Sequence, residues 1–241
     1  MGPAGLSAGL ARACVPGGPL AVLAGVLCGG LEAERGRTGP VAAAFAAWEQ
    51  AWELGNGAEP PCAAELAVAT ARAWGLARVP SPRALLFALH SACALPLRLL
   101  ALQVARGERA LPARGGSALR ARLGALEGGS LLRAAGVEGL LEGDPFGWYL
   151  AAWTPALAEA IGGLAPLLDA LAPAPDPQRL LYEALVPGPL RRALGEFYTP
   201  GWLAEHLVAL AGFRGVPGER LLDPTCGGGA VLAPALRRAL A

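Results

Sequence analysis

Two short segments near the carboxyl end of the chain combine residue types that can bind a charged cofactor. The first, residues 195–200, places two aromatic rings and a hydroxyl directly before a predicted helix over residues 201–210. Thr199 is placed to cap this helix, and Pro200 suits its first position. A helix start with a hydroxyl and free amides suits a carboxylate, although an ordinary helix cap beside two core aromatics has the same pattern. The segment therefore predicts either an anion site or a structural cap.

The second segment, residues 220–229, predicts a short strand that runs into a glycine-rich turn. Residues 220–222 form the strand candidate, Asp223 ends it, three glycines follow Cys226, and residues 230–241 have helical composition despite Pro234. Glycines let the backbone approach a ligand, and the helix start offers N–H groups to an anion. The acidic side chain can accept hydrogen bonds from a cationic or hydroxyl-bearing ligand. An ordinary flexible turn is the competing interpretation.

Together the two segments resemble the paired cofactor motifs of adenine-specific DNA methyltransferases of type I and fused type II restriction-modification systems and related phage-defence proteins. The matching residues are Gly195-Glu196-Phe197-Tyr198-Thr199-Pro200 and Leu222-Asp223-Pro224-Thr225-Cys226-Gly227-Gly228-Gly229. Their order is that of the gamma arrangement of this family. The resemblance is strong over residues 179–241 and weaker over 84–178, where residues 85–90 and 146–150 are similar to the helical region before the methylase domain. Residues before 84 show nothing diagnostic.

The resemblance implies S-adenosylmethionine as the cofactor and assigns roles to particular residues. The residues that would hold its methionine end are Phe197, Tyr198, Thr199 and Pro200. The residues that would form the turn beneath it are Asp223, Cys226, Gly227 and Gly229. The family has serine where Gly228 stands and Thr-Phe-Leu in place of residues 230–232, so we expect a looser turn here.

The catalytic motif of this family has no counterpart in the sequence, so we predict no catalytic residue. A flipped adenine needs an Asn- or Asp-Pro-Pro-aromatic loop whose oxygens accept the amine hydrogens. Asn56 lies in a Gly-Asn-Gly turn, and residues 144–146 lack the second proline and precede the cofactor motif. Only one strand candidate is present, whereas a cofactor fold needs several parallel strands. We therefore expect a fragment that does not methylate DNA by itself.

Upstream of these motifs the sequence predicts helices, and hence a helical region over residues 1–178 before a methyltransferase domain over 179–241. Ser81 and Pro82 predict the start of a long helix that continues past Pro96 to about Arg106. Trp48 and Trp52, with Phe45, share one face of an earlier helix and are expected in the core. His90 is expected to be a core residue as well. Residues 171–177 are the best candidate linker.

Composition limits the class of protein without defining its activity. The net charge of +1 gives no sign of nucleic-acid binding, and all 20 basic residues are arginine. The five cysteines form no C-x-x-C pair, which argues against a disulfide framework or a zinc site and fits a reducing cytoplasm. The uncharged stretch from Ala13 to Leu31 is long enough for a membrane span, but its glycines and prolines favour a buried helix.

The sequence thus predicts a mostly α N-terminal region followed by the start of an α/β, Rossmann-like methyltransferase domain, truncated after its first strand. We expect the parent protein to be a cytoplasmic enzyme that methylates adenine in DNA with S-adenosylmethionine. Expected partners are DNA, the rest of the methylase or other restriction-system subunits, with no membrane. Two alternatives stay open: a non-catalytic helical scaffold or DNA-contacting subunit with vestigial cofactor motifs, and a membrane-associated helical protein.

Overall fold

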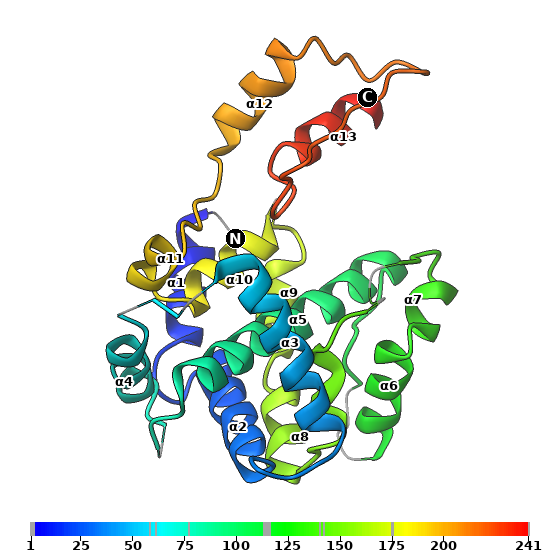
Figure 1. Cartoon of the computed structure of the whole chain (residues 1–241). Coiled ribbons are helices and arrows are strands. Elements are labelled where there is room, and N and C mark those ends of the chain that lie inside the picture. Colours follow the sequence, from blue (N-terminus) through cyan, green and yellow to red (C-terminus); the bar gives the residue numbers. More distant parts are fainter. Residues whose placement is uncertain are drawn as a thin grey trace. The chain divides into compact units, whose positions relative to one another are not determined.

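The computed structural model describes residues 3–57, 59–60, 62–76, 78–112, 117–139, 141, 143–174 and 176–240. The chain divides into two compact units, unit 1 over Met1–Leu194 and unit 2 over Gly195–Ala241. Every regular element within the described residues is helical (Figure 1). The predicted domain division after residue 178 remains a prediction.

Unit 1 contains eleven α-helices and one 3-10 helix within the residues that the structure describes. Their bounds are α1 Pro3–Ala13, α2 Pro19–Ala33, α3 Pro40–Asn56, α4 Ala63–Ala73, α5 Pro82–Arg106, α6 Ser117–Glu127, α7 Ser130–Ala134, η1 Phe146–Leu150, α8 Pro155–Gly162, α9 Ala165–Leu171, α10 Pro177–Leu185 and α11 Gly188–Ala193. Unit 2 contains α12 Gly201–Leu210 and α13 Leu232–Leu240.

Helix α5 runs through the middle of unit 1 and is buried along most of its length (Figure 1). Its start is confirmed as predicted, because the Ser81 Oγ accepts a hydrogen bond from the Ala84 amide at 3.3 Å. Its end is set by Gly107 in the left-handed region, at φ +67°. A helix that is apolar on all sides must be surrounded by other elements. Helices α2, α3, α4, α7, α9 and α10, together with η1, pack against it.

The apolar helices of unit 1 are core helices. Within the described part of the chain, α5 alone is long and apolar enough to cross a membrane, but 78% of its most apolar window is buried inside the protein. Helix α2 covers much of the uncharged stretch from Ala13 to Leu31 and has only 15 residues. Its apolar side packs on α5 and α8, which confirms the expectation of a buried helix there.

An aromatic cluster holds α3, α5 and η1 together. The Trp48 ring lies tilted against Phe87 at 5.4 Å between ring centroids, and Phe87 stacks on Trp148 at 5.5 Å. The Trp148 Nε1 donates to the Ser91 Oγ at 2.8 Å, so the buried indole has a hydrogen-bond partner. Trp48 and Trp52 are buried in the core as predicted, and Phe45 is half-buried against the same core.

His90, on α5, is half-buried, and its ring contacts aromatic rings of α3, η1 and α10. Its Nδ1 accepts a hydrogen bond from the Trp48 Nε1 at 3.2 Å, whereas its Nε2 has no hydrogen-bond partner. Burial lowers the pKa of His90 to about 4. The ring is therefore a neutral core residue, as predicted, with one ring N–H left unsatisfied.

A buried ionic network ties α5 to α6 and to the segment before η1. The Arg98 guanidinium, 4% exposed, donates to Glu127 at 2.5 Å and forms an ion pair with Asp144. The Tyr149 hydroxyl donates to the other oxygen of Glu127 at 2.7 Å. Burial and the adjacent Glu127 carboxylate raise the pKa of Tyr149. Such a network is costly to break, because each remaining charge would be buried without its partner.

The predicted α/β fold class is wrong for the described residues. Residues 220–222, predicted as a strand, belong to no regular element, and no described residue belongs to a sheet. An isolated strand leaves its backbone N–H and C=O groups without a ladder, and the described chain contains no second strand to provide one. The helix after the glycine-rich turn does form, beginning at Leu232 rather than at Ala230.

Glycines lie at several of the other helix boundaries. Helix α7 ends at Ala134, and Gly136 follows it with φ +78°. Residues 155–171 form two helices, α8 and α9, which are separated near Gly163. The N-cap of α3 is Gly39, without a side-chain hydrogen bond.

We predict that Arg98→Ala lowers the free energy of unfolding by roughly 3–5 kcal/mol, because Glu127 and Asp144 lose their buried countercharge. Urea denaturation followed by circular dichroism measures this change. Arg106→Ala is the control, since Arg106 pairs with Glu108 on the exposed end of the same helix and should cost less than about 1 kcal/mol. A loss for Arg98→Ala no larger than that of the control would contradict the prediction.

We predict that His90 makes unit 1 less stable in mild acid. The pKa of His90 is lowered to about 4 from the ordinary value of 6.5, so the unfolded chain binds a proton first as the pH falls between these values. The contribution is present above pH 6.5 and is lost towards pH 4, amounting to roughly 3 kcal/mol. Unfolding free energies measured from pH 8 to pH 4 should fall less steeply for His90→Gln than for the wild type. The exposed-site control, His206→Gln, should keep the wild-type slope.

Candidate functional site

The first predicted cofactor segment, residues 195–200, forms an irregular loop that leads into α12. Gly195 adopts φ +71°, and the Phe197 side chain is 75% exposed. The N-cap of α12 is Pro200, whose carbonyl accepts from the Leu203 and Ala204 amides. No side chain caps the helix, so the predicted capping role of Thr199 is wrong. Helix α12 covers residues 201–210 as predicted, but its N-cap is Pro200, so Thr199 lies one position before the cap.

The second predicted segment, residues 223–229, folds into two consecutive turns. The Asp223 carboxylate accepts from the Thr225 amide at 3.1 Å, and the Gly229 amide donates to the Cys226 carbonyl at 2.7 Å. Gly227 and Gly229 adopt φ +50° and +78°, conformations that favour glycine. Asp223 is half-buried and Cys226 is exposed. These turns lead into α13 and leave backbone atoms accessible to a ligand.

Helices α12 and α13 pack against each other and point in the same direction. The last turn of α13 is held by Arg237, which donates to the Glu205 carboxylate at 2.8 Å, and by Arg238, which donates to the Phe213 carbonyl at 3.1 Å. The carboxyl end of α13 therefore lies beside the second half of α12 and the chain that follows it. The start of α13 consequently lies towards the start of α12, and Figure 1 shows both motif segments at this end of unit 2.

Glu219 fixes the conformation of the loop that connects the two helices. Its carboxylate accepts hydrogen bonds from the backbone amides of Arg214, Gly215 and Val216, the shortest at 2.8 Å. The Arg214 amide is the largest cause of the lowered pKa of Glu219, followed in the same direction by the Arg214 side chain. Three convergent amides form an anion-binding concavity. Here the chain fills that concavity itself, so it fixes the loop and leaves no site there for an external anion.

Unit 2 exposes much apolar surface for its size. Its buried side chains are small or few, while large apolar side chains of both helices and of the turns face solvent. The most exposed of these are Leu222 at 85%, Leu240 at 78%, Phe197 at 75%, Trp202 at 72% and Leu210 at 70%. Apolar surface gathered in this way is typical of a region that contacts another molecule.

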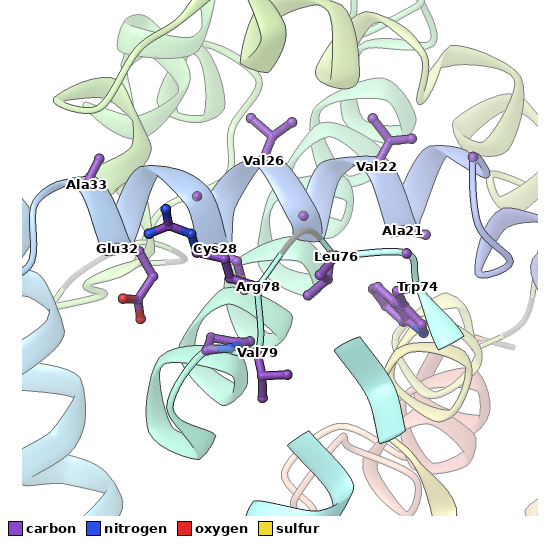
Figure 2. A pocket seen from close by; sticks show the side chains of 15 residues that line it. Ala21, Val22, Val26, Cys28, Glu32, Ala33, Trp74, Leu76, Arg78 and Val79 are labelled. Carbon is purple, nitrogen blue, oxygen red and sulfur yellow. The ribbon is translucent and has the colours of Figure 1, made fainter. Parts of the chain in front are cut away.

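A separate cavity, which the sequence did not reveal, lies in unit 1 between α2 and residues 74–76 and 78–80 (Figure 2). Its volume is ≈ 670 Å³. Apolar side chains including Val22, Val26 and Leu76 line it, and the charged side chains of Glu32 and Arg78 face the same space. The only signal in the sequence is the pair Gly25 and Gly29, one turn apart on an apolar helix.

The described residues contain no group of three or more His, Cys, Asp and Glu side chains that could hold a metal ion. All five cysteines are free, and burial raises the pKa of Cys93 to about 12 and that of Cys14 to about 11. Burial is also the first cause of the raised pKa of Cys28, followed by the nearby Glu32 carboxylate. These three thiols stay protonated at neutral pH and are poor nucleophiles.

Comparison with protein-family models, with curated proteins and with solved structures finds no match for this chain.

We predict that Gly215→Ala disrupts the packing of α13 on the loop after α12. Gly215 has φ +79°, and an added Cβ would lie 2.6 Å from the Ala239 amide nitrogen, a backbone atom that cannot rotate away. Gly212→Ala is a matched control, because Gly212 has φ +70° but open space around its Cβ position. We expect Gly215→Ala to cost roughly 1–3 kcal/mol more than the control. Amide hydrogen exchange across α12 and α13 measures the difference, and equal exchange in the two variants would refute this account.

Proposed function

We propose that this chain carries the S-adenosylmethionine-binding part of a DNA methyltransferase that acts on the amino group of adenine, in restriction-modification or phage defence. The observation that carries the proposal is the placement of the two motif segments. Residues 195–200 and 223–229 belong to one compact unit, each leads into a helix, and the two helices point the same way. This arrangement supports a single ligand that contacts both segments.

The chemistry of the two segments fits the groups that S-adenosylmethionine carries. The first amides of α12, at Gly201 and Trp202, precede the first hydrogen bond of the helix and suit the methionine carboxylate. The exposed ring of Phe197 suits a cationic sulfonium. Asp223 suits an ammonium or hydroxyl group. S-adenosylmethionine supplies the methyl group when it is bound.

Transfer to adenine needs residues that this sequence does not contain. The adenine amine is a poor nucleophile because its lone pair is delocalised into the ring, and the Asn- or Asp-Pro-Pro-aromatic loop that the resemblance implies is absent from residues 1–241. We propose that this loop and the DNA-reading surface come from the rest of the methylase or from another subunit. The exposed apolar side chains of unit 2, with Leu222 and Trp202 among them, support such a contact.

A helical scaffold with vestigial cofactor motifs is the second candidate. It is favoured by the absence of any strand within the described residues, since a scaffold needs no cofactor fold. The two proposals differ in one property, because only the first requires the chain to bind S-adenosylmethionine.

We predict that the 241-residue chain binds S-adenosylmethionine and does not methylate DNA. Equilibrium dialysis with cofactor labelled in the methyl group measures binding, and incorporation of label into DNA measures transfer. Asp223→Asn should weaken binding by at least about tenfold, because it removes a charge-assisted hydrogen bond. Glu138→Gln is the control, since it removes one exposed carboxylate from a loop of unit 1.

Circular dichroism establishes that the chain is folded in this experiment. Absence of binding by the folded chain would exclude the methyltransferase proposal and favour the scaffold. Methyl transfer by the chain alone would show that the catalytic residues lie within it after all.

A further inference from the structure

The cavity between α2 and residues 74–80 has the size of a small-molecule site. Its volume of ≈ 670 Å³ lies within the range of about 300–1,000 Å³ that is usual for ligand pockets. All of its lining residues belong to unit 1, so it is separate from the two motif segments of unit 2. A ligand bound there would be separate from one bound by the motif segments.

Helix α2 leaves space for this cavity because small residues, Gly25 and Gly29 among them, line it. Gly29 has open space where a Cβ would stand, whereas a Cβ at Gly25 would come within 2.9 Å of the Leu76 side chain. The α2 face therefore approaches residues 74–80 closely at Gly25 and leaves room at Gly29. Val22 and Val26 complete an apolar surface suited to an apolar ligand body.

Two opposite charges stand together at one end of this cavity. Figure 2 shows Glu32 and Arg78 at that end and Trp74 at the other. Arg78 is exposed and forms no hydrogen bond or ion pair within the described part of the chain. Glu32 has one oxygen, Oε1, without a hydrogen-bond partner, and its other oxygen reaches only Arg35 at 3.4 Å. An exposed ion pair of this kind contributes little to stability, so the Glu32 carboxylate can exchange Arg35 for a ligand that donates a stronger hydrogen bond.

We propose that this cavity binds a small zwitterion with an apolar body, the chemistry of an α-amino acid that carries a large apolar side chain. The ammonium group of the ligand donates to the Glu32 carboxylate. Rotation of this side chain can present either of its two oxygens to the ligand. The carboxylate accepts from the Arg78 guanidinium, and the apolar body lies along α2 towards Trp74. A fatty acid would leave Glu32 beside a like charge, and a simple amine would leave Arg78 without an anion. A zwitterion satisfies both charges.

L-Phenylalanine, 3-phenylpropanoate and phenethylamine test this proposal, because they share the apolar body and differ in the head group. Titration of the whole chain by isothermal calorimetry should show binding of phenylalanine, with each of the other two compounds weaker by at least about tenfold. Arg78→Gln and Glu32→Gln should each reduce phenylalanine affinity by a similar factor. Equal binding of all three compounds, or no binding of phenylalanine, would overturn the proposal.

A filled cavity provides the steric test. Gly29→Leu places a side chain in the open space and should abolish phenylalanine binding without loss of helix, because leucine favours the helical conformation more than glycine does. Gly124→Leu is the matched control, since Gly124 is a helical glycine of α6 with equally open space and lies outside the cavity. Binding that survives Gly29→Leu would place the ligand elsewhere. Tyr198→Ala should leave phenylalanine binding unchanged, which separates this proposal from the proposed cofactor site.

Discussion

The burial of Arg98 constrains how α6 and the segment before η1 pack on α5. A guanidinium in the middle of an apolar helix must meet carboxylates, because an unpaired buried charge costs several kcal/mol (roughly 3–5). Glu127 at the end of α6 and Asp144 before η1 supply them. Tyr149 then binds the same Glu127 carboxylate, so the aromatic side chains of η1 are held against α5. Arg98 thus adds a polar link between α5, α6 and the segment before η1, which also share the apolar core of unit 1.

Unit 2 is organised by carboxylates in a similar way, although on an exposed surface. Glu205 receives arginines from the last turn of α13, and Glu219 gathers the backbone amides of the loop between the helices. These contacts make α13 run parallel to α12, and this direction brings the two motif segments to one end of the unit. The small core of unit 2 and the exposed apolar side chains around it are typical of a surface that contacts another molecule.

The cavity of unit 1 arises because α2 has glycines where larger side chains would fill the space. Gly29 and its small neighbours leave space beside residues 74–80, while Glu32 supplies a charge at the end of that space. The opposite face of α2 carries the leucines that pack on α5. The same short helix therefore serves the core with one face and forms the wall of a candidate ligand site with the other.

The sequence by itself determined the helix ends and core faces that depend on residues close together in the chain. Ser81, Pro82 and Gly107 mark both ends of α5, because a cap, a fixed φ and a left-handed glycine act within one helical turn. The core position of Trp48 follows from helical periodicity, and the positions of the two motif segments follow from their residue types. Only the tertiary structure decided whether residues 220–222 form a strand, because a strand exists through a partner that lies elsewhere in space. The same holds for the partners of Arg98 and for the placement of Glu32 and Arg78 along one cavity, because residues distant in sequence are brought together by packing that no local pattern predicts.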